Sequence, residues 1–226
     1  HEAHFAAVKP GPTIDNGYRG IGNALFYARL AAPLSLLFAA VYFATNWITS
    51  RRTGNYQLYF EWELAMPFVP SMMYVYGSLL VLLLLPAITL TRAQLTALAR
   101  ALVDALFVAA AVYLLLPADL GFVRPGHVPG YNAVFQALYA LEMPHNLVPS
   151  LHVATSALFI ATLYRGLSPR WIRTGLLLWG VLLCASVLLV HQHHVLDVIS
   201  GLLLGYLCYR LVYLRAIERA RAGAGD

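Results

Sequence analysis

Long apolar stretches dominate this 226-residue chain and limit what it can fold into. Hydrophobic residues make up 60% of the sequence and charged residues only 11%, whereas a soluble domain carries about 25% charged residues. A bilayer-spanning helix needs about 20 residues, and six apolar stretches approach or exceed that length. They lie near 30–48, 68–90, 101–117, 150–167, 172–190 and 195–212. The sequence therefore predicts an all-α polytopic membrane protein with six transmembrane helices in a single domain over residues 1–226.

Basic residues predict how these spans are oriented. An even number of spans places both termini on one side, which then carries most of the 15 lysines and arginines, while Arg51, Arg52 and Arg124 lie opposite. The positive-inside rule predicts cytoplasmic termini in the cell (inner) membrane. The loops expected to face outward, toward a periplasm, are 49–67, 118–149 and 191–194. The net charge of +5 is dispersed among apolar runs, so membrane lipids, not nucleic acid, are the expected partners.

Shorter segments outside the spans receive structural interpretations. Residues 1–29 precede the first span, and 15–29 have the pattern of an amphipathic helix on the membrane surface. Residues 131–141 are expected to form a short helix on the outer surface. Glu61 and Glu63 lie near the membrane interface, and we expect them to form a solvated edge.

Six of the eight histidines gather on or beside the loops that are expected to face outward. They are His127, His145, His152, His191, His193 and His194. Ionisable groups at membrane depth are costly and mark a functional site by default. Their grouping therefore favours a site at the outer ends of the fourth and sixth spans.

One candidate segment runs from Asn146 to His152 and begins the fourth apolar stretch. Pro149 and Ser150 suit a helix start, because proline lacks a donor that the first turn does not need and serine can cap it. The free N–H groups and the helix dipole attract an anion such as phosphate. Ser150 can add a hydroxyl donor and His152 a proton, whereas a simple cap beside an interfacial histidine is the structural alternative.

The other candidate segment contains His191, His193, His194 and Asp197. On a helix, His193 and Asp197 share a face, so the carboxylate can accept the Nδ1 proton and leave Nε2 free to attack. Gly201 and Gly205 continue the stripe and allow a neighbouring helix to approach closely. A zinc or iron site built from these histidines and Asp197 is the alternative, although the spacing differs from H-E-x-x-H.

The run Pro-Ser-Leu-His at 149–152, followed by His193-x-x-x-Asp197, resembles the type-2 phosphatidic acid phosphatase superfamily. Its leucine form, with Asn146 upstream, resembles the branch that includes inositol phosphorylceramide synthases and many bacterial lipid phosphatases. Members have a helical core and are phosphatases or phosphotransferases that need no metal. The resemblance therefore implies an enzyme without a metal or other cofactor.

The same resemblance implies a role for each matched residue. His193 is the nucleophile that forms a phosphohistidine, and His152 protonates the departing lipid alkoxide. Asp197 orients His193, while Arg124 and Ser150 hold the phosphoryl oxygens.

Two basic positions of the superfamily's signatures are not matched. Pro117 stands at the lysine position of the first signature, whose end is matched by Arg124 and Pro125, and Val187 stands at the arginine position of the third. Because phosphoryl transfer depends on charge neutralisation, we expect another basic group to replace these two. The candidates on the same side are Arg51, Arg52 and His191.

These residues favour a lipid phosphatase that removes phosphate from a phospholipid or a polyprenyl (di)phosphate at the outer face. A phosphotransferase that passes the headgroup to an alcohol, as in inositol phosphorylceramide synthases, is the alternative, because both would use the same histidine intermediate. A non-catalytic lipid-binding or transport protein with a degenerate site is the alternative from another class. A rhomboid-like serine protease ranks last, because no Gly-x-Ser context surrounds Ser150.

Overall fold

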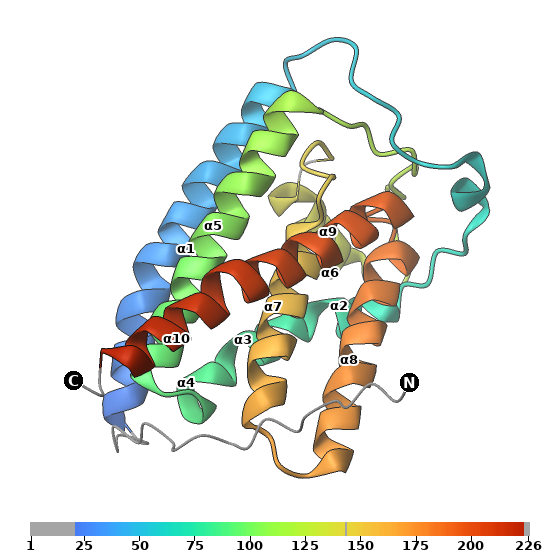
Figure 1. The fold of residues 1–226 in the computed structure, drawn as a ribbon. Helices are drawn as coiled ribbons and strands as arrows, with labels where there is room; N and C mark the ends of the chain where they lie inside the picture. Colours follow the sequence, from blue (N-terminus) through green and yellow to red (C-terminus); the bar gives the residue numbers. More distant parts are fainter. Residues whose placement is uncertain (1–20, 143, 224–226) are drawn as a thin grey trace, which may run out of the picture.

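Helices account for the regular structure of the computed structural model, which describes residues 21–142 and 144–223 (Figure 1). Five of its helical segments are long and apolar enough to cross a membrane. These are Gly22–Thr49, Met72–Thr89, Arg92–Leu115, Arg170–Leu189 and Val195–Ala222. The prediction of an all-α membrane protein is confirmed at this level.

The expected fourth span is shorter than a spanning helix requires. It corresponds to α7 (Leu151–Gly166), which has 16 residues and a length of about 24 Å, against a hydrocarbon core of about 30 Å. Five segments therefore meet the length criterion, where the sequence predicted six spans.

Several expected segments differ in detail from the elements of the structure. The second span is interrupted, and Pro86 begins its last piece, where a missing donor costs nothing. Residues 131–141 contain the predicted short helix. The elements, in chain order, are α1 (Ile21–Thr49), a 3-10 helix (Glu61–Ala65), α2 (Met72–Gly77), α3 (Leu79–Leu84), α4 (Pro86–Thr89), α5 (Arg92–Leu115), α6 (Asn132–Leu141), α7, α8 (Arg170–Leu189), α9 (Val195–Cys208), a π-helical turn (Tyr209–Tyr213) and α10 (Leu214–Ala222).

The described part of the predicted interfacial helix at 15–29 is not a separate element. Residues 15–20 lie outside the described residues. Residues 21–29 form the first turns of α1, which continues without interruption to Thr49. The helix also continues through Pro33, so these residues and the apolar stretch that follows belong to one helix.

Helices α7 and α9 pack closely because glycine forms the contact face of α9. A Cβ atom on Gly201 would lie 2.6 Å from the Ser150 carbonyl oxygen, and one on Gly205 would lie 2.6 Å from that of Ala154. The backbone N–H of Ser150 also donates to the Asp197 carbonyl at 3.1 Å. The predicted glycine stripe is thus confirmed, and it brings together the N-terminal turns of α7 and α9.

Candidate active site

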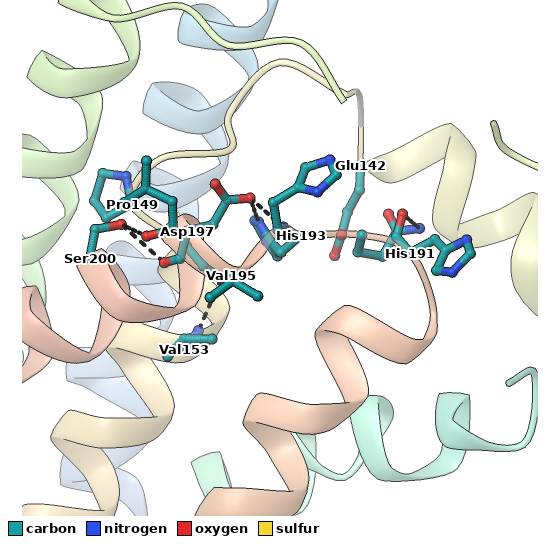
Figure 2. Close-up of polar contacts among 12 residues, drawn as sticks. Glu142, Pro149, Val153, His191, His193, Val195, Asp197 and Ser200 are labelled. Atoms are coloured by element: carbon teal, nitrogen blue, oxygen red, sulfur yellow. Dashed lines mark hydrogen bonds and ion pairs between the residues drawn. The ribbon is translucent and has the colours of Figure 1, made fainter. Parts of the chain in front are cut away.

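His193 lies two residues before the start of α9 and contacts Asp197 in the first turn of that helix (Figure 2). The His193 Nδ1 atom lies 3.1 Å from Asp197 Oδ2, and the same oxygen accepts the backbone N–H of His194 at 2.8 Å. Because a carboxylate only accepts hydrogen bonds, Nδ1 carries the proton and Nε2 keeps its lone pair. The contact is the predicted one, but the prediction placed both residues on a helix, whereas His193 precedes α9.

His152 lies in the first turn of α7 and faces the same cavity as His193. Its ring stacks on Tyr76, with 4.1 Å between ring centroids. Its Nε2 atom is buried and has no hydrogen-bond partner among the described residues. A buried ring nitrogen without a partner is costly, so this atom is available to a ligand. The two histidines of separate sequence segments therefore meet at one cavity.

The cavity that both histidines line has a volume of about 450 Å³ and an amphipathic wall. Glu142, Asn146 and Tyr76 contribute polar atoms near the histidines. Along α7, the wall then passes to Phe159, about two helical turns beyond His152. The remaining apolar wall comes mainly from α1, α3 and α5, and includes Ala31, Leu34, Phe38, Leu83, Leu102 and Ala105. Such a wall suits a molecule with one polar end and a hydrocarbon chain.

Glu142 is a carboxylate in the cavity that the sequence motifs did not reveal. The Tyr76 hydroxyl lies 2.6 and 2.7 Å from its two oxygens. Burial raises the pKa of Glu142, whereas the Tyr76 hydrogen bond and the charges of His193 and Arg124 oppose that rise. Glu142 precedes Asn146 by only four residues, and this proximity to the first motif was the one available signal.

The prediction that Glu63 lies at a solvated edge is wrong, because its side chain is fully buried. One carboxylate oxygen accepts from His194 Nδ1 at 3.1 Å and from the Val195 backbone N–H at 2.8 Å. The other accepts the Phe60 N–H at 3.0 Å. The short 3-10 helix that contains Glu63 folds back over the start of α9, where unpaired N–H groups and the helix dipole stabilise a carboxylate. Glu61, two residues earlier, is exposed as expected.

His194 is held as a neutral ring between two aromatic side chains. Its Nε2 accepts the Gly121 N–H at 3.1 Å, so the proton on Nδ1 points to Glu63. The ring stacks on Tyr59 and Phe122, at centroid distances of 4.6 and 4.4 Å. Burial, as the largest cause, lowers the pKa of His194. Both nitrogens are thus engaged, and the residues described contain no group of three or more His, Cys, Asp or Glu placed to hold a metal ion.

Arg124 and Ser150 lie next to the cavity but do not line it. An Arg124 Nη2 donates to Gln192 Oε1 at 3.1 Å, and the guanidinium lies over the Tyr139 ring at 4.8 Å. Arg124 Nε is buried without a partner. Ser150 Oγ accepts the Val153 N–H at 3.3 Å, as the predicted helix cap. In this structure the two residues predicted to bind phosphate therefore have structural partners.

Arg51, Arg52 and His191, the predicted replacements for the missing basic groups, are not at the cavity. The Arg51 guanidinium lies 4.1 Å from the Trp47 ring centroid, and Arg52 donates to the Leu114 carbonyl. His191 Nε2 lies 3.1 Å from the Met66 carbonyl oxygen, and burial lowers its pKa. None of the three lines this cavity, and their role as replacements for the missing basic groups stays a prediction.

The fold and the site define a membrane-embedded helical protein in which two histidines and an aspartate meet at an amphipathic cavity. A family model described as the PAP2 superfamily matches residues 98–221, more than half of the chain. The chain belongs to the PAP2 superfamily, and its general class is a phosphatase-type lipid phosphoesterase. The match includes α7 and α9 but not α1, α2 and α3, which supply part of the cavity wall. No curated protein and no solved structure matches the chain.

Proposed function

We propose that this protein cleaves the ester between phosphate and a lipid alcohol, with His193 as the nucleophile. The observation that carries the proposal is that His152 and His193 line one cavity whose remaining wall is mostly apolar. Phospholipids and polyprenyl (di)phosphates have the matching shape, a charged end on a hydrocarbon chain. A separate site for a soluble phosphate compound would not need the apolar wall.

The proposed reaction has two steps through one intermediate. His193 Nε2 attacks phosphorus, a P–N bond forms, the P–O bond to the lipid breaks, and protonated His152 gives its proton to the departing alkoxide. Water then attacks phosphorus, the P–N bond breaks, and the water proton passes to His152. Asp197 holds the Nδ1 proton and stabilises the positive ring that forms during attack.

Arg124 and Ser150 are proposed to contribute to phosphate binding from beside the cavity. The unpaired Nε of Arg124 supports this role, because it can still donate to a phosphoryl oxygen. The N-terminus of α7, which Ser150 caps, adds a favourable dipole. We also propose that α7 completes a sixth crossing and that the site faces outward with both termini cytoplasmic, as the basic residues predict.

Assays of lipid phosphate hydrolysis by the purified protein test the proposal directly. Turnover of phosphatidate, a polyprenyl phosphate and a polyprenyl diphosphate would be measured for the wild type, His193→Ala and His152→Ala, with exposed His127→Ala as the matched control. We expect His193→Ala to abolish turnover and His152→Ala to reduce it by roughly 10²–10⁴-fold, while His127→Ala retains it. Label from a ³²P-phosphoester should be trapped on the wild type but not on His193→Ala. Full turnover by His193→Ala would contradict the mechanism.

A non-catalytic lipid-binding protein is the competing proposal, supported by the lack of lysine and arginine in the described cavity wall. It predicts lipid binding without turnover in every variant. Chelation separates the mechanism from a metal-dependent one, because a histidine-based reaction keeps its rate when EDTA is added.

A further inference from the structure

The cavity offers hydrogen-bond acceptors that a phosphate group cannot use. Asn146 Nδ2 donates to the Tyr42 carbonyl and to Thr45 Oγ1, both at 2.9 Å. These two bonds fix the orientation of the amide. The Asn146 side chain is buried, and its Oδ1 atom has no hydrogen-bond partner among the described residues. An unpaired buried acceptor costs about 1–3 kcal/mol, so a hydroxyl donor at this atom would be favourable.

Glu142 supplies a second set of acceptors in the same cavity. In Figure 2 its side chain descends from the end of α6 and lies, in this view, between His193 and His191. A carboxylate has about four lone-pair sites, and the single Tyr76 hydroxyl proton occupies only part of them. Both Asn146 and Glu142 lie close to Tyr42, which also lines the cavity. The free acceptors therefore belong to one region.

The described lining of this cavity contains no lysine or arginine. Phosphoryl oxygens accept hydrogen bonds, and a carboxylate repels their charge. Neither Asn146 Oδ1 nor Glu142 can therefore serve as a phosphate ligand. Neutral hydroxyl groups, in contrast, donate to both acceptors without bringing further charge into the cavity.

We propose that Glu142 and Asn146 form a subsite for the hydroxyl groups of a polyol beside the reacting phosphorus. This inference rests on the proposed function and deepens it by naming a substrate class. The polyol has two possible sources, the headgroup of a phosphodiester lipid or a second, accepting lipid that carries at least two hydroxyls. The first source selects a hydroxyl-bearing donor over a bare lipid phosphate, and the second selects a hydroxyl-bearing acceptor over water.

If the polyol is the accepting lipid, the reaction follows the same two steps, with a hydroxyl of that lipid in place of water. One hydroxyl of the acceptor attacks the phosphorus of the His193 intermediate, its proton passes to His152, a P–O bond forms and the P–N bond breaks. A second hydroxyl donates to Glu142 and remains unchanged. The product is a phosphorylated polyol lipid and the free enzyme.

Binding of a neutral lipid tests the subsite without depending on turnover. Monoolein carries two hydroxyls on an oleoyl chain, and methyl oleate carries the same chain with none. We expect the purified full-length protein to bind monoolein at least about 10-fold more tightly, which corresponds to about 1.4 kcal/mol. Glu142→Gln should lose most of this preference. Exposed Glu61→Gln is the matched control and should keep it.

A second variant covers the case in which Glu142→Gln does not fold. Tyr76→Phe keeps the ring that stacks on His152 but removes the hydroxyl that positions Glu142, and it should weaken monoolein binding and leave methyl oleate unaffected. Equal binding of the two probes to the wild type would overturn the subsite. An unchanged preference in both variants would do the same.

Two activity assays then distinguish the source of the polyol. In one, phosphatidylglycerol is compared with phosphatidate as the donor; in the other, phosphatidate is supplied with monoolein and phosphorylated monoolein is measured. If Glu142→Gln loses the preference for phosphatidylglycerol, the subsite binds the headgroup. If Glu142→Gln instead loses the phosphorylated monoolein product, the subsite binds the acceptor. Turnover by His193→Ala would contradict the proposed mechanism and leave the binding result intact, so the two failures are distinguishable.

Discussion

Replacing Glu63 with alanine should destabilise the protein strongly, although Glu63 contacts no substrate. The carboxylate is fully buried and accepts three hydrogen bonds, one from the His194 ring and two from backbone N–H groups. Each buried donor left without an acceptor costs about 1–3 kcal/mol. Glu63→Ala would leave three such donors, so the total cost is at least about 3 kcal/mol. We therefore expect Glu63→Ala to lower the free energy of unfolding by about 3–5 kcal/mol.

Thermal unfolding in detergent micelles, followed by near-ultraviolet circular dichroism, measures this effect. For a chain of this size, 1 kcal/mol corresponds to about 2–4 °C in Tm, so the expected decrease is about 6–20 °C. Exposed Glu61→Ala, two residues away, should change stability by less than about 0.5 kcal/mol. If both variants unfold at the same temperature, Glu63 does not anchor the start of α9, and the reasoning from its three hydrogen bonds fails.

Further predictions concern helix packing and pH. Gly201→Ala would place a Cβ atom 2.6 Å from the Ser150 carbonyl oxygen; overpacking should cost about 1–3 kcal/mol, and lipid phosphate turnover should fall as α7 and α9 separate. Gly175→Ala, where a Cβ meets nothing within 4 Å, is the control and should be neutral or stabilising. Burial lowers the pKa of His191 in the folded protein. As the pH falls, the His191 ring therefore takes up a proton at a higher pH in the unfolded chain than in the folded protein. The stability that the neutral ring contributes is lost as pH falls below about 6.5. The test variant is His191→Asn, because asparagine tolerates the positive φ of 55° at this position. Between pH 7.5 and 5.0, its free energy of unfolding in detergent should fall by less than that of the wild type. An equal fall in both proteins would exclude this contribution.

The sequence by itself determined the apolar helices and the contacts between residues that are close together in the chain. The apolar stretches define the helices, because unpaired backbone groups are excluded from hydrocarbon. The His193–Asp197 contact and the Ser150 cap each join residues three or four apart at the N-terminus of a helix. The spacing of residues along one turn is fixed by helix geometry, so these contacts could be read directly from the sequence.

Tertiary packing alone decided the contacts between distant segments. Glu63 and His194 are 131 residues apart in sequence, and Tyr76 and Glu142 are 66 apart. The sequence pattern places both glutamates in loops and gives no indication of which becomes buried. Likewise, the charge pattern predicts that Arg51 faces the same side of the membrane as the site, but in the structure it stacks on Trp47 and does not line the cavity. A charge pattern assigns a residue to one side of a bilayer, whereas the packing of helices determines which side chains meet there.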